Sequence, residues 1–233
     1  MNRNKPQYEI APNVWLDPRR AVFLEKTRTL AVADLHLGYV WAHRVRGQMM
    51  PLLQETTLAR LLELISDYQP KTLALLGDIV HETVSIHSIR QTVEELVNEL
   101  CSRIALVLVT GNHDRDLQRM LPGDCIATLK TEFIQEKVRF IHGDQRFDPC
   151  PSVLLTVLGH EHPAFRLGDG VATSARFPCF LWSADLLVLP AFSEWAAGCV
   201  LGSAPFLSPG LQNVRFQQAI VIMGNRLLPI PLL

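Results

Sequence analysis

The 233-residue sequence lacks the features that mark several specialised classes of protein. No apolar run reaches the roughly 18 residues that a membrane-spanning helix needs, and no apolar stretch follows the basic N-terminal residues as in a signal peptide. Internal repeats, low-complexity tracts and blocks of like charge are also missing. These absences predict an ordinary globular protein of the cytoplasm with no membrane partner.

The sequence also lacks the cysteine pattern of a disulfide framework or a structural zinc site. Its 5 cysteines are odd in number and contain no C-x-x-C pair. Several of them stand in apolar surroundings, such as Cys179 between Pro178 and Phe180. We therefore expect reduced, buried thiols, as in cytoplasmic proteins.

Neither sign of charge is in excess. The chain has 22 Lys and Arg against 23 Asp and Glu, a formal net charge of -1. This balance argues against an extended basic face for duplex nucleic acid, although it allows a small local patch. Hydrophobic residues make up 48%, which is enough to bury a sizeable core. The length favours one domain over residues 1–233, and the hydrophobic fraction also fits an interface in a homo-oligomer.

Apolar runs alternate with amphipathic stretches in the first half of the chain. Runs that suit buried strands occupy residues 29–33, 72–76 and 104–109. Helical spacing of leucines predicts one helix that follows Pro51 and ends at Pro70, and a second that begins at the N-cap Ser85 and reaches Leu100. Strand and helix in alternation are typical of right-handed βαβ crossovers.

Strand patterns dominate the two ends of the chain. We expect strands at residues 14–16, 21–24, 138–141, 153–158, 180–182, 186–189, 219–222 and 227–228. Segment 191–213 is rich in Gly, Pro and Ser and predicts a long loop region.

Five of the apolar runs end in short polar clusters made of metal-binding residue types. The clusters are Asp34-Leu35-His36, Gly77-Asp78, Gly111-Asn112-His113-Asp114, His142-Gly143-Asp144 and Gly159-His160-Glu161-His162. Ligands of open α/β sheets bind beyond the carboxyl ends of the strands, so the clusters converge if the strands are neighbours. Asp, Asn and neutral His suit Mn²⁺, Fe or Zn²⁺. For any single residue the alternative is an ordinary cap or turn.

In this order the five clusters resemble the motifs of the calcineurin-like metallophosphoesterase superfamily. The flanking residues 33–38, 46–47, 51 and 159–164 are similar to its ligase-associated phosphoesterase subgroup, as is Pro190-Ala191-Phe192 followed by Gly198. The resemblance implies a four-layer α/β/β/α sandwich, in which two mixed sheets are flanked by helices. It also implies two divalent metal ions, with Mn²⁺ favoured and Fe or Zn²⁺ as alternatives, and a functional link to DNA ligase or helicase proteins.

The resemblance assigns a role to each polar residue. The implied ligands are Asp34, His36 and His162 for the first ion, Asp78 as a bridge, and Asn112, His142 and His160 for the second ion. His113 would be the general acid that protonates the leaving oxygen, with Asp114 orienting it. The alternative is that His113 is a further ligand of the second ion. A hydroxide bridging the ions would attack phosphorus in line with the leaving oxygen.

Three further residues are candidate substrate contacts. Arg44 and Arg46 follow the first cluster, where a guanidinium fork can clamp a phosphate, although a solvated surface loop is the alternative. His81 either contacts substrate or a metal-bound water, or only hydrogen-bonds its own loop. The tryptophans that can stack on a base, if they are not core residues, are Trp41, Trp182 and Trp195.

The function predicted from these residues is hydrolysis of a phosphodiester at a dimetal centre. The substrate would be a nucleotide, a cyclic nucleotide or a nucleic-acid end. Alternatives are a phosphomonoesterase or nucleotide pyrophosphatase of the same superfamily, and an inactive binding module, which the intact His113 opposes. Because two divalent cations would add to the net charge of -1, the site would attract a phosphodiester even in a nearly neutral chain.

Overall fold

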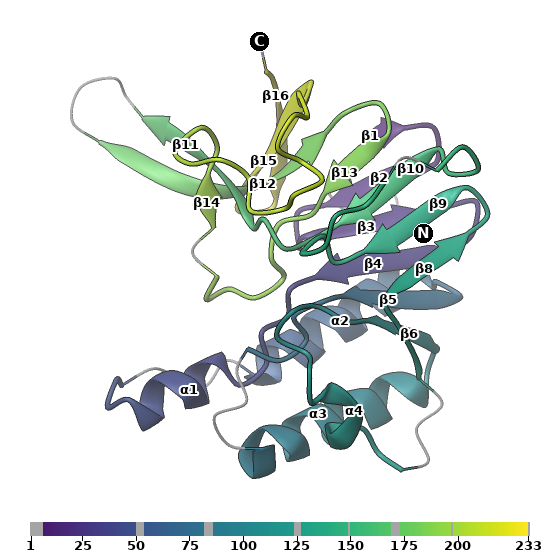
Figure 1. The fold of residues 1–233 in the computed structure, drawn as a ribbon, viewed down its shortest axis with the longest axis vertical. Coiled ribbons are helices and arrows are strands. Elements are labelled where there is room, and N and C mark those ends of the chain that lie inside the picture. Colours follow the sequence, from purple (N-terminus) through teal and green to yellow (C-terminus); the bar gives the residue numbers. More distant parts are fainter. Residues whose placement is uncertain are drawn as a thin grey trace.

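Two mixed sheets that pack face to face form the centre of the structure, a computed structural model (Figure 1). It describes residues 7–49, 54–81, 86–123, 127–148, 150–168, 173–196 and 198–232. The helices lie on the outer side of the first sheet. The predicted α/β class with two mixed sheets is confirmed, and among the described residues helices flank the first sheet only, so the outer helix layer expected on the second sheet is replaced by loops.

The first sheet joins an antiparallel region to a parallel one. Its strands, in spatial order, are β1 (Tyr8–Ala11), β2 (Val14–Asp17), β3 (Ala21–Leu24), β4 (Thr29–Ala33), β5 (Thr72–Leu76), β6 (Ala105–Val109) and β7 (Thr128–Lys130). Neighbours from β1 to β4 are antiparallel, and neighbours from β4 to β7 are parallel. The carboxyl ends of β4, β5 and β6 therefore lie at the same end of the sheet.

The helices that the structure describes all lie before residue 121. They are α1 (Tyr39–Val45), α2 (Gln54–Tyr68), α3 (Ile86–Cys101) and α4 (Leu117–Met120). As the apolar spacing predicts, α2 and α3 connect β4 to β5 and β5 to β6. The expected start signals, Pro51 and Ser85, lie outside the described residues. None of the helices in the described ranges is long and apolar enough to cross a membrane.

Alternation along the central strands divides the core into two layers. In β4, Leu30 and Val32 pack with the helices, whereas Ala31 and Ala33 face the second sheet. This follows from the two-residue period of a strand, and it explains why the run is apolar without a break. The small alanines bring the two sheets close together near the end of β4, where the first polar cluster begins.

The second sheet has the order β14-β11-β12-β13-β10-β9-β8, with β15 paired to β12 and β16 to β15. Its strands are β8 (Glu132–Gln135), β9 (Val138–Ile141), β10 (Leu155–Leu158), β11 (Pro163–Gly168), β12 (Ser174–Trp182), β13 (Leu186–Val188), β14 (Cys199–Val200), β15 (Gln218–Met223) and β16 (Arg226–Pro231). Parallel β9 and β10 end side by side. Within the described ranges, loop residues such as Leu211 and Phe216 cover its outer face, and no helix does.

Apolar runs predict the buried strands and overlook the short exposed elements. The expected strands at 29–33, 72–76, 104–109 and 138–141 are present within one residue, and the described part of segment 191–213 contains only the two-residue β14. In contrast, β7, β8 and the end of β11 alternate between exposed and half-buried residues. A strand with little buried surface has no apolar run to mark it.

Candidate metal centre

Backbone pairing beyond β4 and β5 brings their polar clusters together. The N–H of His36 donates to the carbonyl of Asp78 at 2.9 Å, and the N–H of Leu37 donates to the carbonyl of Ile79 at 2.8 Å. The N–H of His81 then donates to the carbonyl of Leu37 at 2.9 Å. The two loops therefore run side by side, and they place residues about 40 positions apart in sequence in one site.

The second sheet adds its clusters from across the core between the sheets. His142 follows β9, and His160 and His162 follow β10. The N–H of Gly159 donates to the carbonyl of His142 at 3.0 Å, which ties the two loops together. The N–H of His160 donates to Oδ2 of Asp34 at 3.0 Å. A carboxylate of the first sheet is thus bonded directly to the backbone of the second.

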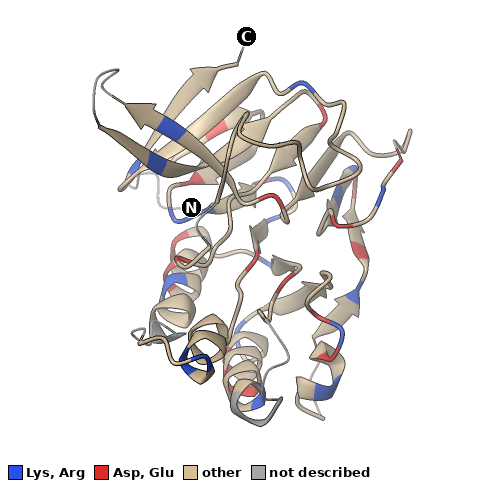
Figure 2. Ribbon diagram, turned by 60° about the vertical axis from the view of Figure 1, so that its left-hand side comes forward, with Lys and Arg blue, Asp and Glu red and all other residues tan. Residues whose placement is uncertain are grey.

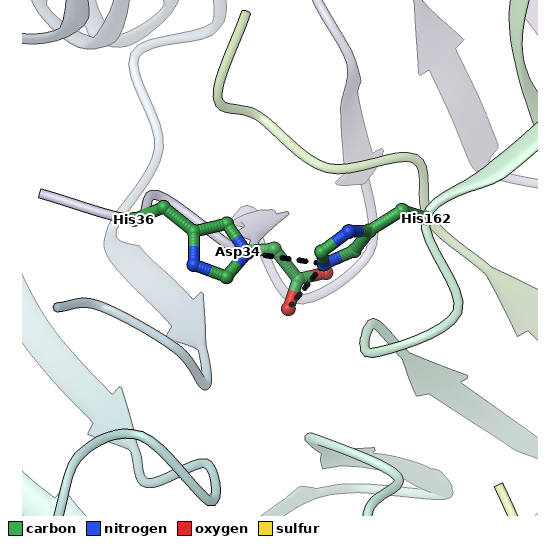
Figure 3. Close-up of side chains that lie close together, drawn as sticks. All are labelled: Asp34, His36 and His162. Atoms are coloured by element: carbon green, nitrogen blue, oxygen red, sulfur yellow. Dashed lines mark hydrogen bonds and ion pairs between the residues drawn. The ribbon is translucent and has the colours of Figure 1, made fainter. Parts of the chain in front are cut away.

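Asp34, His36 and His162 form a first ligand group, whose ligand atoms all lie within 4.8 Å of one another. The Nε2 atoms of His36 and His162 are 3.2 Å apart, and Oδ1 of Asp34 is 3.5 Å from Nε2 of His162 (Figure 3). Two atoms that are each about 2.1 Å from one ion lie roughly 3.0–3.4 Å apart at octahedral or tetrahedral angles. The spacing is therefore close to that of ligands sharing one ion.

Asp78, His142 and His160 form a second ligand group, again with ligand atoms within 4.8 Å of one another. Nε2 of His142 is 3.1 Å from Nδ1 of His160 and 3.4 Å from Oδ1 of Asp78. The amide oxygen of Asn112 is also 3.1 Å from this nitrogen. Four donor atoms from the loops after β5, β6, β9 and β10 thus surround one point.

Two buried polar atoms between the groups have no hydrogen bond within the described part of the chain. They are Oδ1 of Asp34 and Nδ1 of His142, which lie 3.5 Å apart in side chains that are 0% and 1% exposed. A buried polar group without a partner costs about 1–3 kcal/mol. A cation held by the first ligand group would give Oδ1 of Asp34 its missing partner, so the residues fit a metal ion.

The backbone is strained at most of the ligands. Left-handed φ angles between 42° and 68° occur at Asp34, His36, Asp78, His160 and His162. Each such angle in a non-glycine residue costs of order 1–3 kcal/mol, and it persists only where the surrounding structure enforces it. Strain that is concentrated at the ligands indicates a site shaped for binding rather than for stability.

Two glycines let the loops approach the ligands. Gly77 has a φ of 65°, and a Cβ atom there would lie only 2.1 Å from Nδ1 of His142. At Gly159 a Cβ atom would lie 2.5 Å from Oδ2 of Asp34. Both distances are far inside van der Waals contact, so any side chain at these positions would displace a ligand.

Burial and neighbouring charges hold the ligands in metal-binding protonation states. Burial lowers the pKa of His36 to about 3 and also lowers that of His160. The neutral imidazole, which is the form that binds metals, is therefore favoured at both. Burial favours the protonated form of Asp34, but His162, His142 and His36 together outweigh it and lower its pKa. The pKa of His162 is raised, because the charge of Asp34 outweighs burial, so metal binding there competes with a proton.

His113 lies beside the second ligand group and is not one of its members. Its backbone N–H donates to Oδ1 of Asp78 at 3.1 Å, and its ring nitrogen Nε2 is 3.9 Å from Oδ2 of Asp78. The ring is 36% exposed and faces solvent over the site. The Asp114 carboxylate accepts the N–H groups of Gly111 and Val80 at 2.8 and 3.1 Å. Asp114 thus fixes the loop that carries His113, and its role in orienting the His113 ring stays a prediction.

The three candidate substrate residues lie in different surroundings. His81 reaches the site, since its Nδ1 is 3.4 Å from Nδ1 of His36 and its ring is stacked 5.8 Å from that of His113. Arg44 and Arg46 are exposed at the end of α1, and the guanidinium of Arg44 is 6.0 Å from the ring of Trp41. Contact of either arginine with substrate stays a prediction.

Periodicity does not reveal the segment 190–195, which pairs with the end of β4. In the sequence it stood out only through the similarity of Pro190-Ala191-Phe192 to the ligase-associated subgroup and through Trp195 as a candidate to stack on a base. The N–H groups of Phe192 and Ser193 donate to the carbonyls of Ala33 and Asp34 at 2.7 and 3.1 Å. Buried Glu161 was given no role, yet its carboxylate accepts the N–H groups of Leu207 and Ser208 and anchors that loop. Neither the segment 190–195 nor the loop at residues 207–208 has a periodicity that predicts its position. The Asp-Leu-His and His-Glu-His spacings point only to the clusters at 34–36 and 160–162, against which these segments lie.

Comparison with known proteins places this geometry in context. A family model described as calcineurin-like phosphoesterase matches residues 27–185. A crystal structure of Pseudomonas putida nuclease MPE is similar, with a TM-score of 0.69 and 25% identity over 96% of this chain and 98% of that chain. A protein of unknown function from Aquifex aeolicus, AQ665, has 17% identity over 57% of this chain and 77% of that chain, and its TM-score of 0.38 supports no argument. No curated protein matches the sequence significantly.

Proposed function

Because the chain belongs to the calcineurin-like phosphoesterase family of metal-dependent hydrolases, we propose that it cleaves phosphodiesters of nucleotides or nucleic-acid ends. The observation that carries the proposal is the meeting of two Asp and His ligand groups at the ends of strands from both sheets. The similar structure is named a nuclease, which supports nucleic acid as the source of the phosphodiester.

The ligand groups support a pair of divalent ions. In this proposal Asp34, His36 and His162 hold one ion, Asn112, His142 and His160 hold the other, and Asp78 bridges them. Oxygen and imidazole donors without a thiolate favour Mn²⁺, with Fe and Zn²⁺ as alternatives. When bound, the ions would neutralise the phosphoryl oxygens and lower the pKa of a water molecule.

His113 is the proposed general acid. Its ring is half-exposed, lies next to Asp78 and is outside both ligand groups, so its nitrogen is available to a leaving oxygen. Imidazole is the side chain that most often serves as a general acid near neutral pH. The bond from the backbone N–H of His113 to Asp78, and the bonds from Gly111 and Val80 to Asp114, fix the loop backbone that carries the ring.

The distribution of charge is compatible with a small substrate or a strand end. Lys and Arg are interspersed with Asp and Glu along the ribbon in Figure 2, in keeping with the net charge of -1. A protein without a large excess of positive charge gains little from long stretches of duplex phosphate. We propose that Arg44 and Arg46, with His81, contact the phosphate locally.

We extend the proposal to setting and partners. Similarity to the ligase-associated subgroup leads us to propose a functional link to DNA ligase or helicase proteins. Cys101, Cys150, Cys179 and Cys199 are free thiols, which agrees with a reducing cytoplasm. Affinity purification of the tagged protein from its own cells would test the link, and recovery without either partner would count against it.

The function is tested by comparing a diester with a monoester. With Mn²⁺ present, we expect the purified protein to hydrolyse bis-p-nitrophenyl phosphate faster than p-nitrophenyl phosphate. His113→Ala should lower kcat by roughly 10²–10⁴-fold, because a general acid contributes about that much. Its Mn²⁺ content, measured by elemental analysis, should stay unchanged.

A matched control is Arg103→Gln, which removes an exposed ion pair with Glu99 and should not alter turnover. A folded, metal-loaded protein that cleaves neither ester would refute the proposal. A faster monoester rate would indicate the phosphomonoesterase alternative. Loss of Mn²⁺ from His113→Ala would show that His113 is a ligand.

A further inference from the structure

A recess opens directly beside the first ligand group. It has an empty volume of about 350 Å³ and is lined by one metal ligand candidate, His36, together with residues 37–40 and 193–195 and with Thr56 and Thr57. Its walls come from the start of α1, the first turns of α2 and the segment that pairs with the end of β4. A molecule in this recess would touch the ring of His36.

Two aromatic side chains form one side of the recess. The rings of Tyr39 and Trp195 are parallel within 5°, with centroids 6.3 Å apart, and both residues are half-buried. The Tyr39 ring also lies 4.5 Å from His81 and 4.3 Å from His43. Flat, partly exposed aromatic faces next to a phosphate-cleaving centre suit the planar ring of a base.

The lining of the recess offers no cation to a phosphate. None of the described lining residues is Lys or Arg, and the one acidic residue among them, Glu194, is paired with the Arg60 guanidinium at 3.6 Å. Ser193, Thr56 and Thr57 supply hydroxyl groups that can donate and accept hydrogen bonds. The recess therefore favours the neutral, hydrogen-bonding part of a nucleotide, while the ligand groups next to it attract the charged part.

Two arginines, Arg20 and Arg60, hydrogen-bond the backbone on the Trp195 side of the recess. The Arg20 guanidinium donates to the carbonyls of Ala191 and Ser193, and the Arg60 guanidinium donates to the carbonyl of Phe192 at 3.0 Å. These bonds, together with the pairing of the segment with β4, fix the backbone that carries Trp195. The backbone of this wall is thus fixed before substrate binds, which lowers the entropic cost of ordering it on binding.

We propose that this recess binds a nucleoside attached to the scissile phosphate, with Trp195 and Tyr39 stacking on its base. The proposal rests on the phosphodiesterase function and adds which part of the substrate is recognised. Trp195 and Tyr39 would then be specificity residues. Replacing either one should lower kcat/KM more for a substrate with bases than for one without.

The first test compares thymidylyl-thymidine with the same sugar–phosphate diester lacking both bases. The quantity measured is kcat/KM for the diester with bases divided by kcat/KM for the diester without bases. We expect Trp195→Ala to lower this ratio roughly 5- to 150-fold, the range that corresponds to about 1–3 kcal/mol of stacking on one aromatic residue. Trp195→Phe keeps a flat face and should retain most of the ratio. Arg103→Gln is again the control, because Arg103 pairs with Glu99 and does not line the recess. A ratio that Trp195→Ala leaves unchanged would overturn the proposal.

The second test needs no catalysis and so separates this inference from the proposed function. Adenosine is the probe, and saturation-transfer NMR reports its contact with the protein. We expect transfer to the adenine protons with the wild type and with Trp195→Phe, and its loss with Trp195→Ala. If adenosine received as much saturation transfer from Trp195→Ala as from the wild type, the proposed binding of a base in the recess would be wrong, even if the protein cleaves diesters. Failure to cleave either diester, with adenosine still bound through Trp195, would instead refute only the proposed function.

Discussion

Replacing Gly111 by alanine tests whether close loop packing sets the metal site. Gly111 has no left-handed φ, so alanine adopts its backbone without strain. Its Cβ atom would nevertheless lie 2.5 Å from both the N and the Oδ1 atoms of Asp78, against the 3.4 Å at which ordinary contact begins. Asp78 and the Gly111 loop must therefore separate by about 0.9 Å.

That displacement is large compared with the tolerance of a metal site. Ligand distances normally hold within about 0.2 Å, and disturbing the surroundings of a ligand typically costs roughly 10- to 100-fold in metal affinity. We expect Gly111→Ala to weaken Mn²⁺ binding by at least that range and to lower kcat/KM on the order of 10²-fold. In the metal-free protein, overpacking should lower the free energy of unfolding by about 1–3 kcal/mol.

Gly123→Ala is the matched control, since a Cβ atom there meets nothing within 4 Å. Free Mn²⁺ during a titration can be followed by electron paramagnetic resonance, and diester hydrolysis gives kcat/KM. Circular dichroism in EDTA measures the stability of each variant without metal. If Gly111→Ala bound Mn²⁺ and turned over substrate as Gly123→Ala does, the inferred coupling between loop packing and Asp78 would be wrong.

Contacts elsewhere in the molecule lead to three more expectations. The Arg60 guanidinium donates to the carbonyl of Phe192 and lies 4.0 Å from the Phe192 ring. Arg60→Gln should therefore lower the free energy of unfolding in urea by about 1–3 kcal/mol, with partial recovery in Arg60→Lys. An unchanged urea midpoint would show that these contacts do not stabilise the fold. Mn²⁺ at 100 times its Kd should stabilise the folded state by about 2.7 kcal/mol, so EDTA should lower the melting temperature. A melting temperature that is the same with Mn²⁺ and with EDTA would exclude a metal site specific to the folded chain. Burial raises the pKa of the Cys179 thiol to about 12, whereas a hydrogen bond from Ser152 lowers the pKa of the more accessible Cys150. Mass spectrometry after iodoacetamide treatment at pH 8 should therefore find Cys150 alkylated and Cys179 intact, and comparable labelling of both would contradict the buried position of Cys179.

The buried strands could be predicted because their signal is local. The runs at 29–33 and 72–76 are continuously apolar, since a strand between a helix layer and a second sheet is covered on both faces. In contrast, α1 and β11 are short and partly exposed, and their sequences contain no run or stripe that separates them from loop. What marks them is pairing with distant partners, such as β14 beside β11.

The candidate ligands could be named for a similar reason. Asp, Asn and His directly after apolar runs carry their chemistry in the residue type, and the order of the clusters resembles that of a known family. Their grouping could not be predicted in this way. Nε2 of His36 lies 3.2 Å from Nε2 of His162, although the two residues are 126 positions apart. Sequence spacing has no information about which strand ends face each other across two sheets.

The sequence by itself determined the chemistry of this protein: a dense set of Asp and His donors at strand ends, a nearly neutral charge and no thiolate site. Only the tertiary structure decided the geometry. Packing of the two sheets brought the donors into two groups, placed His113 outside both, and put Trp195, from a segment without periodicity, at the edge of the recess. The physical reason is that residue type and local periodicity act within one element, whereas a site is made by contacts between elements, and those depend on how the whole core packs.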